Sequence, residues 1–125
     1  MIKQIPSDKI KEFIKEKPKS ILLDVRTKEE WDQGKPDGDK IGIKTYFLSS
    51  QFHGRIINEN FVKEFEGLKI DKDYEILVMC GSGNRSQRAA ELLTEKGFKC
   101  SNVSDGFRGD GEEKIGWKNN KLPIK

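Results

Sequence analysis

Residues 76–96, ILVMCGSGNRSQRAAELLTEK, decide the fold. The apolar run 76–79 has the length and composition of a buried strand. A tight loop with two glycines follows at residues 80–86. We expect a helix over residues 86–96, because its alanines and leucines recur at helical spacing and Gly97 is well placed to end it. Strand, glycine loop and helix in direct succession predict an α/β fold.

The same alternation of strand and helix extends over the rest of the chain. The expected elements are a helix capped by Ser7, a strand at 21–23, a short helix from the Thr27–Glu30 capping box to about Gln33, a turn at 34–38, a strand at 41–47, a loop at 48–58, a helix at 59–66 and a last strand at 98–103. This alternation predicts a parallel sheet covered on both faces, with the functional site at the carboxyl ends of its strands. Residues 24–26 and 80–86 both follow such strands.

Size and composition indicate one domain over residues 1–125. Hydrophobic residues make up 34% of the chain and charged residues 36%, and apolar runs recur along it, which excludes a disordered composition. The net charge is only +3, so we expect no nucleic-acid partner. No stretch reaches the roughly 20 apolar residues that cross a bilayer, and the start lacks the apolar core of a signal peptide. We therefore expect no membrane partner and a cytoplasmic protein, or a periplasmic one if an export signal has been removed.

Few residues could bear metal or redox chemistry. The two cysteines, Cys80 and Cys100, make no disulfide framework, and no Cys/His cluster has metal-ligand spacing, so we expect no metal. Cys100 lies in an apolar strand, where a packing role is favoured over that of a resolving thiol. The single histidine, His53, lies in a polar loop, and we expect no function for it.

The segment Cys80–Ser86 has the features of a loop that activates a thiol. Two glycines, Gly81 and Gly83, let successive N–H groups point inward as an anion-binding nest. The following helix N-terminus, together with Arg85 and Arg88, adds positive charge. Such surroundings lower the pKa of a cysteine from ~8.5 to roughly 3.5–7.5. The alternative is a small buried hydrophobe, but a structural cysteine does not need glycines and an arginine in this order.

Three motifs lie along the chain. The first is the loop CGSGNRS at 80–86, the second is LLDVRTKEEW at 22–31, and the third combines Gly106 with Gly116-Trp117 and Leu122-Pro123. Together these motifs resemble those of the rhodanese family of sulfurtransferases. The resemblance spans roughly residues 20–123. It departs from the family at 34–39, where GKPDGD replaces the usual Gly-His-Ile-x-Gly-Ala turn.

The resemblance implies a three-layer fold: a five-stranded parallel sheet flanked by helices on both faces, with the active loop after the central strand. The strand that ends at Asp24 lies beside this central strand. Asp24, Arg26 and Glu30 then support the loop near its rim, with Arg26 and Glu30 paired. Independently of the resemblance, the position of Arg88 one turn into the helix after the loop favours a modest electrostatic role, because a cationic cleft raises the local concentration of anions. The persulfide-binding loop consists of Gly81, Ser82, Gly83, Asn84, Arg85 and Ser86.

The activity implied by the resemblance is sulfur transfer through a persulfide on Cys80, with no metal or organic cofactor. The expected donor is a small anion such as thiosulfate or a polysulfide, and the expected acceptor is cyanide, a thiol or a protein cysteine. One alternative is a phosphatase or arsenate reductase of the same fold, whose loop is one residue longer. The other is a non-catalytic binding or regulatory module, although such modules usually lack the loop cysteine.

Overall fold

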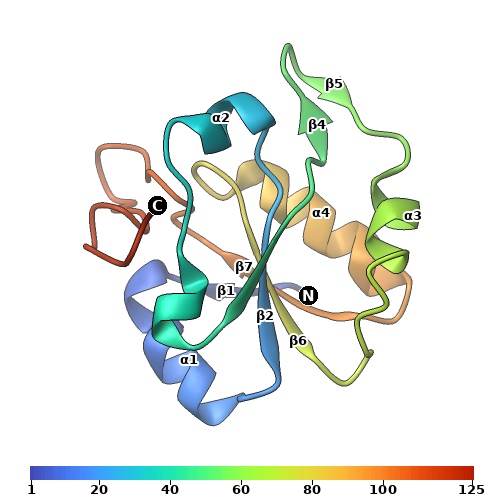
Figure 1. Ribbon diagram of the computed structural model, residues 1–125, viewed down its shortest axis with the longest axis horizontal. Helices are drawn as coiled ribbons and strands as arrows, with labels where there is room; N and C mark the ends of the chain where they lie inside the picture. Colours follow the sequence, from blue (N-terminus) through green and yellow to red (C-terminus); the bar gives the residue numbers. More distant parts are fainter.

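A five-stranded parallel sheet forms the centre of the computed structural model, which describes residues 1–125 (Figure 1). The strand order is β1-β7-β6-β2-β3, and every neighbouring pair is parallel. The strands are β1 (Lys3–Ile5), β2 (Ser20–Asp24), β3 (Lys44–Phe47), β6 (Glu75–Met79) and β7 (Lys99–Val103). The expected fold class is confirmed. The central strand β6 precedes the Cys80 loop (residues 80–86) and has β2 beside it, as the resemblance implied.

Helices cover both faces of the sheet, which gives three layers (Figure 1). Residues of α3 (Phe61–Glu66) and α4 (Asn84–Glu95) pack on one face, and those of α1 (Ile10–Glu16) and the C-terminal segment (residues 104–125) pack on the other. The α-helices are α1 (Ile10–Glu16), α2 (Lys28–Asp32), α3 (Phe61–Glu66) and α4 (Asn84–Glu95), and the 3-10 helices are η1 (Ser7–Lys9) and η2 (Gly38–Ile41).

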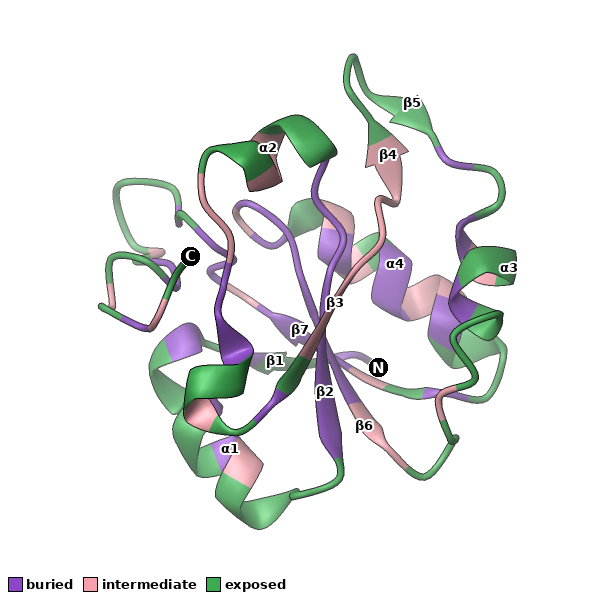
Figure 2. Ribbon diagram, in the orientation of Figure 1, coloured by how far each residue is buried: buried purple, intermediate pink, exposed green.

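The alternation of side chains along β6 builds two separate cores. Ile76, Val78 and Cys80 pack toward α3 and α4, whereas Leu77 and Met79 pack toward α1 and the C-terminal segment. Successive side chains of a strand point to opposite faces, so a strand buried on both faces is continuously apolar. Figure 2 shows the resulting buried centre of the sheet. Cys80 is thereby fixed on the α4 side.

The structure corrects several local expectations. Lys3–Ile5 form an edge strand, β1, that was not predicted from the sequence. Three residues are too few to show the alternation of apolar and polar side chains that is typical of a strand. The strand expected at 41–47 begins only at Lys44, because Gly42 takes a φ of 87° and ends η2. Ser7 does not cap α1: its hydroxyl donates to Asp105 at 2.6 Å, and the helix begins after a 3-10 turn.

The expected loop at 48–58 contains a two-stranded antiparallel hairpin, β4 (Gln51–Phe52) with β5 (Ile56–Ile57). It stands apart from the main sheet, above the carboxyl ends of its strands and near α2 (Figure 1). No helix of the chain is both long and apolar enough to span a membrane.

Candidate active site

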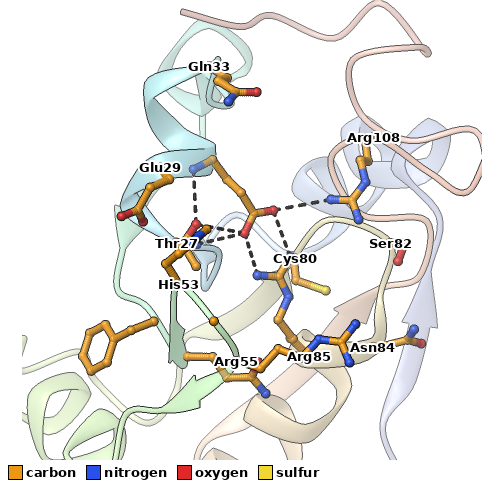
Figure 3. A pocket seen from close by; sticks show the side chains of 14 residues that line it. Thr27, Glu29, Gln33, His53, Arg55, Cys80, Ser82, Asn84, Arg85 and Arg108 are labelled. Carbon is orange, nitrogen blue, oxygen red and sulfur yellow. Dashed lines mark hydrogen bonds and ion pairs between the residues drawn. The ribbon is translucent and has the colours of Figure 1, made fainter.

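Cys80 lies directly after β6 and lines a polar cavity (Figure 3). Its side chain is buried, with 1% of its surface exposed. The cavity has a volume of about 710 Å³, and only 2 of the 14 residues that line it are hydrophobic. Those residues come from α2, the β4–β5 hairpin, the Cys80 loop and the C-terminal segment. The thiol is therefore held in the protein interior but faces a space suited to polar molecules.

Hydrogen bonds favour the thiolate form of Cys80. The Gly83 N–H donates to Sγ at 3.2 Å, and the Ser86 hydroxyl lies 3.3 Å from Sγ. Burial raises the pKa of Cys80, but hydrogen bonds from Ser86 and from the Gly83 and Ser82 amides outweigh burial and lower it below the ordinary value. Gly83 has a φ of 103°, which brings its N–H toward the sulfur just before α4 begins. The nest of amides expected from the sequence is thus present.

Asn102 of β7 orients Ser86. The Ser86 Oγ lies 2.5 Å from Asn102 Oδ1, and Asn102 Nδ2 donates to the Gly83 carbonyl at 3.0 Å and to Gln4 at 2.8 Å. A serine hydroxyl has a single hydrogen, which it donates either to Asn102 or to the sulfur. Ser86 can therefore accept from the thiol while it donates to Asn102, and turn to donate to the thiolate. Asn102 was not singled out from the sequence, because nothing local marks a β7 residue as a loop partner.

We expect Ser86→Ala to raise the pKa of Cys80 by about one to two pH units, because a hydrogen bond to a charged group contributes ~1.5–3 kcal/mol. The measurement is the pH dependence of iodoacetamide alkylation at Cys80, followed by mass spectrometry. Ser82→Ala is the matched control, since it keeps the main-chain amide that favours the thiolate. An unchanged midpoint in Ser86→Ala would show that the amides alone depress the pKa.

Arg85 pairs with Glu30 of α2. Its Nη1 and Nη2 donate to the two carboxylate oxygens at 2.6 and 2.9 Å. Glu30 also accepts from the Thr27 amide in the predicted capping box, and Arg108 Nη1 lies 3.4 Å from it. The expected pairing of Arg26 with Glu30 is wrong: two residues from distant parts of the chain occupy this carboxylate instead. Glu30 thus contacts both Arg85 and Arg108.

Asp24 and Arg26 form a buried ion pair beneath the site. Arg26 Nε and Nη2 donate to the Asp24 carboxylate at 3.0–3.1 Å, and Nη2 also donates to the Gly34 carbonyl at 3.0 Å. Burial raises the pKa of Asp24, and the Arg26 guanidinium opposes this shift. The guanidinium lies 4.1 Å from the centre of the Phe107 ring. The Phe107 N–H donates to the Cys80 carbonyl. Phe107 therefore connects the Asp24–Arg26 ion pair to the Cys80 loop.

Comparison with known proteins identifies the family to which the chain belongs. A family model of the rhodanese-like domain matches residues 7–112. The chain belongs to the rhodanese-like domain family. It is 40% identical over 125 residues to an uncharacterized protein of Rickettsia conorii, covering 98% of this chain and 96% of that one. It is 34% identical over 103 residues to thiosulfate sulfurtransferase 18 of Arabidopsis thaliana, covering 82% of this chain and 69% of that one.

Among solved structures, the crystal structure of Rv0390 from M. tuberculosis resembles this rhodanese-like domain with a TM-score of 0.85 at 31% identity. The likeness covers 98% of this chain and 96% of that one. Both the sequence and the fold therefore match over nearly the whole chain.

The C-terminal segment holds the Cys80 loop of this rhodanese-like domain from outside. The Arg108 N–H donates to the Gly81 carbonyl at 3.0 Å, and Lys114 Nζ donates to the Ser82 carbonyl at 2.9 Å. Gly106 packs against the backbone of Cys80 and Gly81. Gly106 belongs to a motif that is visible in the sequence, but the contacts of Arg108 and Lys114 are not, because their partners are backbone carbonyls more than 25 positions away.

Two other candidates, Arg88 and Cys100, do not line the Cys80 cavity. Arg88 forms an ion pair with Glu91 at 3.5 Å and lines a neighbouring cavity rather than that of Cys80. Cys100 pairs in register with Ile76, at the opposite end of the strands, and burial raises its pKa to about 11. This position favours the packing interpretation. His53, for which no function was expected, lines the Cys80 cavity.

The Glu30 pairing predicts an acid-sensitive contribution to stability. Desolvation alone would raise the pKa of Glu30, but hydrogen bonds from Arg85 and Thr27 lower it from 4.5 to about 2. A carboxylate whose pKa is depressed by folding stabilises the fold fully above its unfolded pKa and loses that contribution as the pH falls through its folded pKa. We expect Glu30→Gln to lower the free energy of unfolding by about 1–2 kcal/mol at pH 7, a discounted value because the pair is partly exposed.

The measurement is the urea-unfolding midpoint of both proteins across the acid range. Because the other carboxylates titrate in both proteins, only the Glu30 contribution remains in the difference. That difference should shrink between pH 4.5 and about 2. A difference independent of pH would show that Glu30 acts through packing and not through its charge.

Proposed function

We propose that the chain is a sulfurtransferase that carries a sulfane sulfur as a persulfide on Cys80. The observation that carries this proposal is the buried thiol of lowered pKa, held by the Gly83 amide and the Ser86 hydroxyl and open to a polar cavity. A thiolate is the nucleophilic form of cysteine. Family membership and relatives named as sulfurtransferases support the same activity.

The reaction takes two nucleophilic steps. The Cys80 thiolate attacks the sulfane sulfur of thiosulfate, the S–S bond of the donor breaks, and sulfite leaves with the electron pair. The acceptor, cyanide or a thiolate, then attacks the outer sulfur of the persulfide, and the Cys80 thiolate departs. The hydrogen-bond donors that lower the pKa of Cys80 also stabilise the anionic persulfide between these two steps.

A phosphatase or arsenate reductase activity is disfavoured by the state of Arg85. In a loop that binds a tetrahedral oxyanion, an arginine is useful only if its planar fork faces the anion. Here both Nη atoms of Arg85 bind Glu30. The loop also has only four residues between Cys80 and Arg85, one fewer than those relatives have, so its ring of amides is smaller.

Intact-mass spectrometry tests the proposal. Incubation with thiosulfate or polysulfide should add the mass of one sulfur atom, and peptide mapping should place it on Cys80. Later addition of cyanide should remove that sulfur and release thiocyanate. A chain that never gains sulfur but hydrolyses an aryl phosphate through Cys80 would require the phosphatase assignment instead.

A further inference from the structure

The β4–β5 hairpin gives the Cys80 cavity a wall that sulfur transfer from small inorganic ions does not require. Gln51, Phe52, His53, Gly54 and Arg55 all line the cavity. Its volume of about 710 Å³ lies within the range of ~300–1,000 Å³ that is usual for sites of small organic molecules. Thiosulfate and cyanide are far smaller than this. The cavity therefore has room for an organic substrate whose sulfur reaches Cys80 while its remaining groups contact the hairpin.

Among the three arginines of the cavity, Arg55 alone has no acidic partner. Arg85 binds both oxygens of Glu30, and Arg108 lies 3.4 Å from the same carboxylate. Arg55 forms no ion pair within 4.0 Å and no side-chain hydrogen bond. In the view of Figure 3, Arg55 and Arg108 lie on opposite sides of Cys80. Arg55 is thus the guanidinium available to bind an anionic group of a substrate.

The backbone of Arg55 supports a functional role. Its φ is 63°, in the left-handed region, next to Gly54 at 84°. Glycine and asparagine occupy this region most readily, whereas other residues are uncommon there and carry strain. Strained residues of this kind cluster at sites that bind ligands. An arginine at the tip of a three-residue hairpin turn, facing the cavity of the reactive thiol, fits that pattern.

We propose that Arg55 binds a carboxylate of an anionic low-molecular-weight organic thiol, which exchanges sulfur with Cys80. This inference rests on the proposed function and names the substrate class of the same site. The planar guanidinium matches a carboxylate through two parallel hydrogen bonds. In the transfer, the substrate thiolate attacks the outer sulfur of the Cys80 persulfide. The S–S bond breaks, the substrate leaves as its persulfide, and the Cys80 thiolate is restored.

The kinetic test starts from protein loaded with sulfur by polysulfide and then mixed with glutathione, which carries two carboxylates, or with uncharged 2-mercaptoethanol. Arg55→Asn removes the charge but suits the left-handed backbone. We expect it to slow transfer to glutathione about tenfold and to leave transfer to 2-mercaptoethanol unchanged. Arg55→Lys should recover part of the rate. Lys15→Ala, on the distant helix α1, is the matched control for loss of one positive charge.

A binding measurement keeps the test independent of sulfur transfer. S-methylglutathione has no reactive thiol, and its dissociation constant should rise about tenfold in Arg55→Asn. The melting temperature of Arg55→Asn should equal or exceed that of the wild type, since asparagine relieves the backbone strain. Equal losses with both thiols, or no change in either glutathione measurement, would overturn the role of Arg55. A wild-type chain that binds S-methylglutathione through Arg55 but never gains sulfur would refute the sulfurtransferase proposal alone.

Discussion

Replacement of Cys80 by serine is expected to abolish sulfur transfer, by more than about a thousandfold, and to leave the fold intact. Serine is nearly the same size as cysteine and can occupy the buried position between Gly83 and Ser86. Its hydroxyl is not ionised at neutral pH and forms no persulfide. The measurements are thiocyanate release from thiosulfate and cyanide, together with the intact mass after loading. Circular dichroism verifies that the variant is folded.

Cys100→Ser is the matched control for this prediction. Cys100 is paired with Ile76, and four residues of strand, about 13 Å, separate that register from Cys80. Its pKa of about 11 keeps it protonated at neutral pH. We therefore expect this variant to retain most of its activity. A folded but inactive Cys100→Ser protein would show that the mechanism needs a second thiol.

Gly106→Ala is expected to lower sulfur transfer about a hundredfold and the free energy of unfolding by about 2–4 kcal/mol. Gly106 has a φ of 66°, and a Cβ placed on it would lie 2.5 Å from the Gly81 carbonyl and 2.6 Å from the Cys80 carbonyl oxygen. These neighbours are backbone atoms, so relief of the clash must shift the Cys80 loop itself. The displaced amides would then no longer match the sulfur.

Gly111→Ala is the control that measures the cost of alanine in a left-handed backbone without a steric clash. Gly111 has a φ of 82°, but a Cβ there would meet nothing within 4 Å. We expect a loss of about 1 kcal/mol from the left-handed backbone and no loss of activity. The measurements are chemical unfolding and steady-state sulfur transfer for both variants. Similar behaviour of the two would mean that only backbone strain matters and that Gly106 does not position the loop.

Short-range patterns in the sequence were sufficient to predict several strands, a helix cap and the Cys80 loop. The apolar runs before Asp24 and Cys80 predicted the two central strands, because a strand buried on both faces needs continuous apolar residues. The capping box of Thr27 and Glu30 is present as predicted, since its bonds join residues three apart. The glycines and the helix start around Cys80 predicted the amides that face the sulfur. Each of these signals acts within a few residues of the chain.

The tertiary structure alone decided which distant groups meet at the thiol. Glu30 was expected to pair with Arg26, but Arg26 is taken by buried Asp24, and Glu30 binds Arg85 instead. Asn102 comes from a neighbouring strand and Arg55 from a hairpin that carries no clear period in the sequence. The physical reason is that an ion pair or hydrogen bond depends on which side chains the packed sheet brings within about 3 Å, and spacing along the chain does not encode that distance. The sequence thus indicated Cys80 and its loop as the candidate site, and the packing of the sheet decided which distant residues contact that loop.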